Sequence, residues 1–206
     1  MTYNPDIHHR HSIRLKDYDY SQAGAYFITI CAWQRECPFG EIVDGEMVLN
    51  DMGRIVKSVW YGLSKHFNSI HLDEYMIMPN HFHGILQISE FVGGVGAKQG
   101  SSALPAFDLH GNKGKAGGAF ALPLQPVRGS VSGSLCSIVQ NFKSVSTRKI
   151  NKFRNNPGCP VWQRNYYERV IRNEDELSRA REYVVNNPMK WELDKENPIN
   201  HRDNIK

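Results

Sequence analysis

Two histidines set two positions apart are the residues in this sequence best suited to chemistry. His81 and His83 lie in HFHGILQI, whose apolar and β-branched residues predict a strand. Alternate side chains of a strand share a face, so both imidazoles point the same way as Ile85 and Gln87. Two neutral imidazoles about 7 Å apart along a strand can converge on one divalent ion. The motif alone is a weak signal, because two polar strand residues give the same pattern.

A second pair lies near the carboxyl end of the sequence. Asn173, with Glu176 three residues later, resembles a capping box and predicts a helix that ends near Asn187, just before a proline. Tyr183 and Asn187 are four residues apart and share a face of that helix. A metal needs further ligands, and phosphate chemistry needs a nucleophile or an activated water; this pair offers candidates. Packing of the tyrosine and C-terminal capping by the asparagine are the structural alternatives.

The remaining elements predict an α+β fold that would position these two pairs. Strands are expected at 25–33, 69–78, 81–88 and 166–171, with a small hairpin around Asp44 and Gly45. Apolar residues at helical spacing predict helices from Met52 to Leu63 and from Leu135 to Val145. Without the hairpin, the order is βαββαβ plus a terminal helix, which is the ferredoxin-like arrangement. It predicts an antiparallel sheet with two helices on one face and an additional C-terminal helix.

The composition indicates one globular domain spanning residues 1–206. Residues 91–130 hold nine of the 17 glycines and three of the ten prolines, so we expect a flexible Gly-rich insertion within that domain. No apolar run approaches the roughly 18 residues of a membrane span, and no secretory leader is evident. The four cysteines form no C-x-x-C pair, which favours free thiols in a reducing, cytoplasmic setting.

Positive charge is concentrated in one stretch, although the net charge is only +4. Between Arg128 and Arg172 there are nine basic residues and a single acid, Glu168. This asymmetry suggests a surface that binds a polyanion, most simply nucleic acid. A basic face that is only solvated gives the same pattern, so the charge alone does not separate the two.

Three segments with ordered spacing resemble a known family. MPNHFHGILQI, WQRNYYERVIRNEDEL and YVVNNP are similar to the HUH single-strand DNA transposases that use one tyrosine, and in detail to their REP-associated tyrosine transposase branch, relatives of insertion-sequence-200-like transposases. The opening HSIRLKDYDYSQAGAYFITI also resembles that branch. The resemblance covers about residues 10–90 and 130–193, with the Gly-rich stretch in the gap.

The resemblance implies roles for both pairs of residues. His81 and His83 would hold Mg²⁺ or Mn²⁺, Asn187 would be the third ligand, and Tyr183 would be the nucleophile. Relatives usually have glutamine at the third-ligand position, so the shorter asparagine requires the helix to lie nearer the metal. Tyr167 is the main rival nucleophile.

The implied activity is metal-dependent nicking and rejoining of single-stranded DNA at palindromic repeat hairpins, through a 5′-phosphotyrosine intermediate. The protein would act as a monomer or homodimer. Two alternatives stay open: an inactive or domesticated protein that only binds structured nucleic acid, and a phosphodiesterase that uses activated water. The residues expected to contact DNA, by charge or by stacking, are Arg14, Lys143, Arg148, Lys149, Lys152, Arg154, Trp162, Arg164, Tyr167, Arg169 and Arg172.

Overall fold

The computed structural model describes residues 18–89, 130–194 and 196–200. A four-stranded antiparallel sheet carries the two histidines of the candidate site. Its strands, in their order across the sheet, are β4 (Ile70–Ile77), β5 (His81–Ile88), β1 (Gly24–Cys31) and β6 (Tyr167–Ile171). All three neighbouring pairs are antiparallel. The predicted α+β class with an antiparallel sheet is therefore confirmed.

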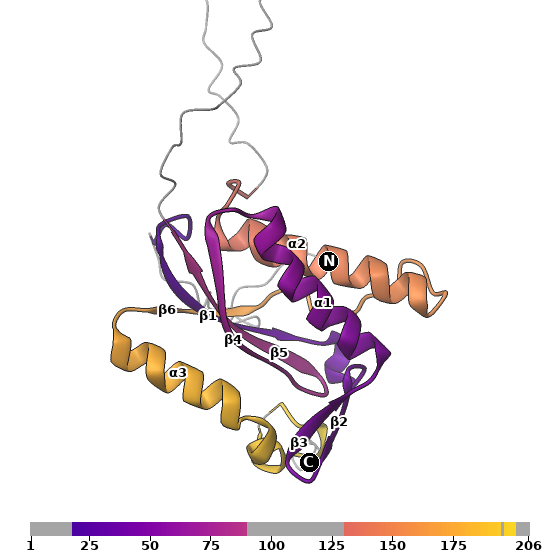
Figure 1. Cartoon of the computed structure of the whole chain (residues 1–206). Coiled ribbons are helices and arrows are strands. Elements are labelled where there is room, and N and C mark those ends of the chain that lie inside the picture. The colour runs from indigo at the N-terminus through magenta and orange to yellow at the C-terminus, as the bar shows by residue number, and fades with distance from the viewer. Residues whose placement is uncertain (1–17, 90–129, 195, 201–206) are drawn as a thin grey trace, which may run out of the picture. The chain divides into compact units, whose positions relative to one another are not determined.

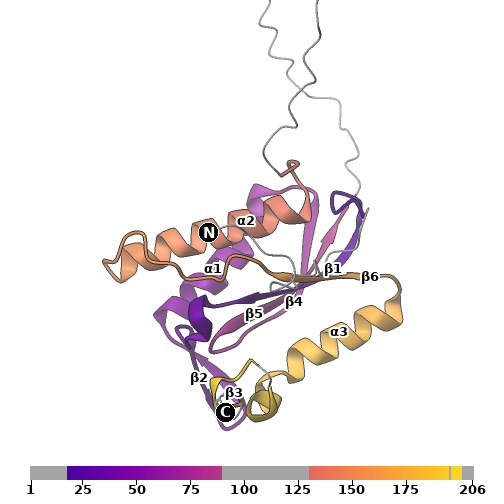
Figure 2. The same cartoon turned by 180° about the vertical axis from the view of Figure 1, so that it is seen from behind.

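Helices cover both faces of this sheet. Helices α1 (Asp51–His66) and α2 (Leu135–Phe153) pack on one face, and α3 (Glu174–Asn186) lies on the other (Figures 1 and 2). The chain order of the main sheet and its helices is βαββαβ followed by α3, as the sequence predicted. None of the helices within the described ranges is long and apolar enough to cross a membrane.

Polar side chains cap α1, α2 and α3 at their N-termini. The side chains of Asn50, Ser134 and Asn173 each accept a hydrogen bond from a backbone N–H three residues later. Each cap therefore satisfies one of the amides that the first turn leaves unpaired. The cap on α3 marks the start of that helix, and the buried Leu177 and Val184 define its face toward the sheet.

The two faces of β5 contribute to different parts of the core. Phe82 and Leu86 belong to the large core beneath α1 and α2, whereas Ile85 belongs to a smaller core with Leu177 and Val184 of α3. This is the alternation that the sequence predicted. The face that carries His81, His83 and Ile85 is consequently the face that α3 covers.

Gly84, between the two histidines, allows the large core to pack closely. An added Cβ would lie 2.7 Å from the Phe82 ring and 2.8 Å from the Trp60 ring. Both rings are fully buried, so they have little room to move. We expect Gly84→Ala to lower the free energy of unfolding by about 1–3 kcal/mol in urea denaturation.

The matched control is Gly62→Ala, in α1, where an added Cβ meets nothing within 4 Å. Alanine favours a helix over glycine by up to about 1 kcal/mol, so this variant should be slightly stabilised. Equal stability of the Gly84→Ala and wild-type proteins would contradict the packing argument.

A separate hairpin is formed by β2 (Gly40–Val43) and β3 (Glu46–Leu49). Its turn residues, Asp44 and Gly45, both have positive φ, 50° and 78°. This is the backbone that an Asp-Gly hairpin turn requires, and it confirms the predicted hairpin. The short helix η1 (Trp33–Arg35) precedes β2.

The chain beyond α3 folds back toward the start of β5. The expected end of the helix near Asn187 is confirmed, but the reason given by the sequence is wrong: Asn187 keeps helical angles (φ −61°, ψ −41°) although a proline follows. Pro188 occupies the first turn of the next helix, η2 (Pro188–Leu193), where its missing N–H costs nothing. Helix η2 leads to Glu196, whose carbonyl oxygen accepts a hydrogen bond from the Asn80 amide at 2.6 Å.

Two predicted features fall outside the described residues. The Gly-rich insertion at 91–130 lies outside them except for Ser130, and so does Arg14 of the N-terminal arm.

Candidate active site

The histidine pair lies at the start of β5, buried under α3. His81 and His83 are 0% and 3% exposed, and their Nε2 atoms are 3.0 Å apart. Each ring is held from its other side: His81 Nδ1 lies 2.8 Å from Asn80 Oδ1, and His83 Nδ1 lies 2.9 Å from Thr29 Oγ1. The two Nε2 atoms therefore converge, as the strand geometry predicted.

Helix α3 brings the second predicted pair to the histidines. The Tyr183 ring lies edge-on to the His83 ring, with centroids 5.3 Å apart, and it also contacts Phe27 at 5.9 Å. Asn187 is 3% exposed, and its side chain is a hydrogen-bonding partner of the Tyr183 hydroxyl. All four predicted residues thus belong to one site built by a single chain.

The surroundings of Tyr183 keep its phenol protonated at neutral pH. Burial is the main cause that raises its pKa above the usual value of 10, and the carboxylates of Asp194 and Glu196 raise it further. The hydrogen bond from Asn187 acts in the opposite direction. A nucleophilic role for this oxygen would need a nearby cation or a base to take the proton.

One amide oxygen in the site has no partner. Asn187 Oδ1 is buried and accepts no hydrogen bond from the described part of the protein. A buried, unpaired oxygen is costly, and a metal ion is one ordinary partner for it. Together with the two converging Nε2 atoms it makes a donor set that fits a divalent cation. Among the described residues no group of three His, Cys, Asp or Glu side chains has metal-binding geometry.

A cleft of about 710 Å³ opens between α3 and the sheet. His83 and Tyr183 line it, and the half-exposed Tyr167 and the largely exposed Arg169 line it as well. A second arginine on α3, Arg179, also borders the cleft one turn before Tyr183. Four carboxylates, those of Glu168, Glu176, Asp194 and Glu196, line the cleft beside the two arginines, and Glu176 pairs with Arg169 at 3.8 Å. The cleft therefore combines His83 and Tyr183 with an aromatic face and with charges of both signs.

Sequence reasoning missed several residues that support the site. Thr29 and Asn80 hold the histidine rings, and Asp194 Oδ2 lies 3.8 Å from His81 Nε2. Glu196 accepts a hydrogen bond from Cys31 Sγ at 3.6 Å and pairs with Arg35 at 3.5 Å. Asn80 directly precedes the motif and Thr29 is a polar residue in an apolar strand, so these two carried a usable signal. The two acids carried none, because they lie in a segment without periodicity.

Seven of the residues predicted to contact DNA lie on the surface, where their side chains are accessible to a DNA strand. They are Arg148, Lys149, Lys152, Arg164, Tyr167, Arg169 and Arg172. Their role in DNA binding stays a prediction.

The other predicted contact residues in the described region have structural partners. Trp162 is only 6% exposed, and its indole N–H donates to Ser146 Oγ while Phe39 and Phe142 pack around its ring. The expectation that Trp162 offers a face to unpaired bases is therefore wrong, because an alternating core position and a stacking platform look alike in sequence.

Two of the basic residues are likewise occupied. Lys143 Nζ donates to the carbonyl oxygens of Gln163 and Arg164 at 2.6 and 2.9 Å, and burial lowers its pKa. Arg154 donates to the Asn151 side chain and to the Cys159 carbonyl. Both cations stabilise the loop after α2, and a direct phosphate contact would have to compete with these bonds.

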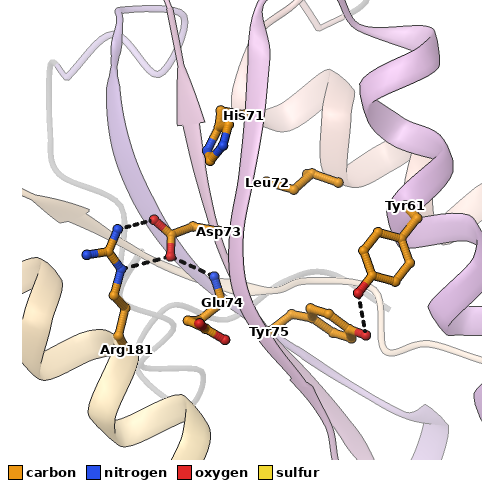
Figure 3. Close-up of a pocket in the computed structure, with 7 residues that line it drawn as sticks. All are labelled: Tyr61, His71, Leu72, Asp73, Glu74, Tyr75 and Arg181. Carbon is orange, nitrogen blue, oxygen red and sulfur yellow. Dashed lines mark hydrogen bonds and ion pairs between the residues drawn. The ribbon is translucent and has the colours of Figure 1, made fainter.

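An ion pair on the far side of α3 holds that helix against β4. Arg181 Nε and Nη2 donate to the two carboxylate oxygens of Asp73 at 2.9 and 2.6 Å (Figure 3). Asp73 lies at an irregularity of β4, between Leu72 and Tyr75, that turns its carboxylate toward the helix. This pair borders a second pocket of about 600 Å³, and it holds α3 two residues before Tyr183.

This ion pair predicts a stability difference that depends on pH. The hydrogen bonds from Arg181 lower the pKa of Asp73 below its usual 3.8, so the pair stabilises the fold above about pH 4 and the contribution is lost as pH falls through the lowered pKa. We expect Arg181→Met to lower the free energy of unfolding by about 1 kcal/mol at pH 7 and by less near pH 2, measured by urea denaturation at both values. The control is Arg179→Met, since the Arg179 guanidinium donates to a backbone carbonyl. A pH-independent cost for Arg181→Met would contradict the assignment.

Comparison with known proteins places the chain in a family. A protein of Haemophilus influenzae, described as an uncharacterized protein, is 42% identical over 198 residues, which cover 93% of this chain and 95% of that protein. The chain therefore belongs to the same family as this Haemophilus protein. No family model matches the sequence.

A solved structure shares the fold. It is described as a REP-associated tyrosine transposase bound to a REP hairpin, and it matches with a TM-score of 0.50 and 14% sequence identity over 86% of this chain and 73% of that one. The two structures share the arrangement of helices and sheet. At 14% sequence identity the match shows a similar fold.

Proposed function

We propose that this protein cuts and rejoins single-stranded DNA beside a hairpin, through a covalent bond between the DNA and Tyr183. The observation that carries the proposal is that His83 and Tyr183 line one cleft with their rings 5.3 Å apart. Behind them, His81 Nε2 lies 3.0 Å from His83 Nε2, and the buried Asn187 Oδ1 has no partner in the described part of the protein. The hairpin named with the structurally similar transposase supports structured DNA as the substrate.

The chain's residues would divide the work as follows. His81, His83 and Asn187 would hold Mg²⁺ or Mn²⁺, which when bound neutralises charge that develops on the phosphate. Tyr183 Oη would attack the phosphorus and lose its proton as the P–O bond forms. The bond to the 3′-oxygen breaks, and that oxygen leaves as a 3′-hydroxyl after taking up a proton. Because the phosphodiester energy is kept in the 5′-phosphotyrosine, a 3′-hydroxyl can reverse the step without ATP.

Exposed residues away from the reacting centre would also bind the DNA. The exposed basic residues of α2 and of the loop after it would bind phosphates, and the half-exposed Tyr167 would stack on an unpaired base. Since all four reacting or ligating residues come from one chain, the site needs none from a second copy, and a monomer would suffice.

The test is a covalent-adduct assay with labelled single-stranded hairpins taken from palindromes that flank the gene. In Mg²⁺ or Mn²⁺ we expect a labelled band on the protein that survives SDS, together with a free 3′-hydroxyl on the released strand. Binding without an adduct would instead favour the nucleic-acid-binding alternative. Free 5′-phosphate ends without an adduct would favour hydrolysis by activated water.

A further inference from the structure

The hydrogen bonds of Asn80 determine which nitrogen of His81 carries a proton. The Asn80 side-chain Nδ2 donates to the carbonyl oxygens of Glu196 and Arg35, at 2.6 and 3.3 Å. Its Oδ1 therefore faces His81 Nδ1, at 2.8 Å. Because an amide oxygen can only accept, His81 Nδ1 must donate, and the neutral ring keeps its lone pair on Nε2.

The same reasoning extends to His83. Its Nε2 lies 3.0 Å from His81 Nε2, a hydrogen-bond distance that requires one hydrogen between the two nitrogens. Since His81 Nε2 holds a lone pair, His83 must supply that hydrogen from its own Nε2. A neutral His83 then has a lone pair on Nδ1, which accepts the Thr29 hydroxyl at 2.9 Å. Donation thus runs in one direction, from Thr29 through both histidines to Asn80.

A bound cation requires a different arrangement of the same protons. Both Nε2 lone pairs must then face the cation, so the hydrogen on His83 Nε2 has to move to Nδ1. His81 needs no change. The Thr29 hydroxyl must switch from donor to acceptor, which a hydroxyl can do by rotating and a methyl group cannot. The number of protons on the two rings stays the same.

We propose that Thr29 is a positioning residue whose hydroxyl lets His83 exchange tautomers when a divalent cation binds, while Asn80 keeps His81 in one tautomer. This inference rests on the proposed function, because it assigns the supporting groups of the same metal site. Partners of metal-binding histidines typically contribute 10–100-fold to metal affinity.

The direct test is ¹⁵N NMR of the histidine rings at pH 8, above the ordinary histidine pKa of about 6.5. Without metal we expect His81 with its proton on Nδ1 and His83 with its proton on Nε2. With saturating Mg²⁺, a diamagnetic probe, His83 should carry the proton on Nδ1 and His81 should be unchanged. An unchanged His83 would overturn the inference. So would a metal-free His81 protonated on both nitrogens.

Two substitutions separate this role from a merely structural one. Thr29→Val keeps the shape but removes the hydroxyl, and we expect Mn²⁺ affinity, measured by electron paramagnetic resonance, to fall about 10–100-fold. Thr29→Ser keeps the hydroxyl and should restore the affinity. Circular dichroism of the metal-free variants checks that they are folded. Wild-type Mn²⁺ affinity in folded Thr29→Val protein would refute the role of the hydroxyl.

The outcomes also separate this inference from the proposed function. If His83 changes tautomer with Mg²⁺ but no DNA adduct forms, the supporting roles stand and the transesterase proposal fails. If the wild-type protein forms the adduct but His83 keeps one tautomer, only the assignment of Thr29 fails.

Discussion

Replacing Tyr183 by phenylalanine should abolish the covalent DNA adduct, with a loss on the order of 10⁴-fold in rate, because no other group in the site would form the bond. The fold should be unaffected. Tyr183 is 45% exposed, and its ring contacts with Phe27 and His83 do not need the hydroxyl. Hairpin affinity, measured by fluorescence anisotropy, is therefore expected to stay close to that of the wild type.

The matched control for this variant is Tyr167→Phe. Tyr167 lines the same cleft and is similarly exposed, at 52%, but it lies on β6 and not on α3. We expect this variant to form the adduct, with at most weaker DNA binding from a changed stacking face. An adduct in Tyr183→Phe that disappears in the Tyr183→Phe, Tyr167→Phe double variant would move the nucleophile to β6.

Local patterns were sufficient to predict the parts of the site that depend on a single element. The two-residue period of β5 gave the shared face of His81 and His83, and helical spacing gave the shared face of Tyr183 and Asn187. The resemblance then linked the two pairs. The structure adds the reason that they meet: α3 packs on the sheet face opposite to α1 and α2, which no local pattern determines.

Long-range contacts are the part that sequence reasoning could not supply. Lys143 and Trp162 were read as surface residues, yet their partners are a distant loop and the core between α2 and the sheet. Asp194 reaches His81 only because Pro188 starts a second short helix that turns the chain back. In each case a side chain's role depends on a segment far along the chain, and composition and period carry no information about that partner.

Removing one imidazole is the second change with a large expected effect. Lewis-acid stabilisation by a metal ion is worth several kcal/mol, and each 1.36 kcal/mol is tenfold in rate, so His83→Ala should slow adduct formation by about 10²–10⁴-fold in Mg²⁺. Mn²⁺ binding should weaken in parallel, whereas the surface proposed to bind the hairpin should be unaffected. The rate of adduct formation over a range of Mn²⁺ concentrations measures both effects together.

Burial makes controls necessary for this variant. His83 is 3% exposed and its ring stacks on Phe27, so alanine leaves a cavity and His83→Gln, which fills more of the space, should be measured beside it. His71→Ala is the control for losing an imidazole elsewhere, since His71 is exposed on β4 beside the pocket of Figure 3. We expect it to keep full activity. If folded His83→Gln protein forms the adduct at the wild-type rate in Mg²⁺, the histidines are not the ligands of a catalytic ion. The developing charge on the phosphate would then have to be stabilised by other groups around Tyr183.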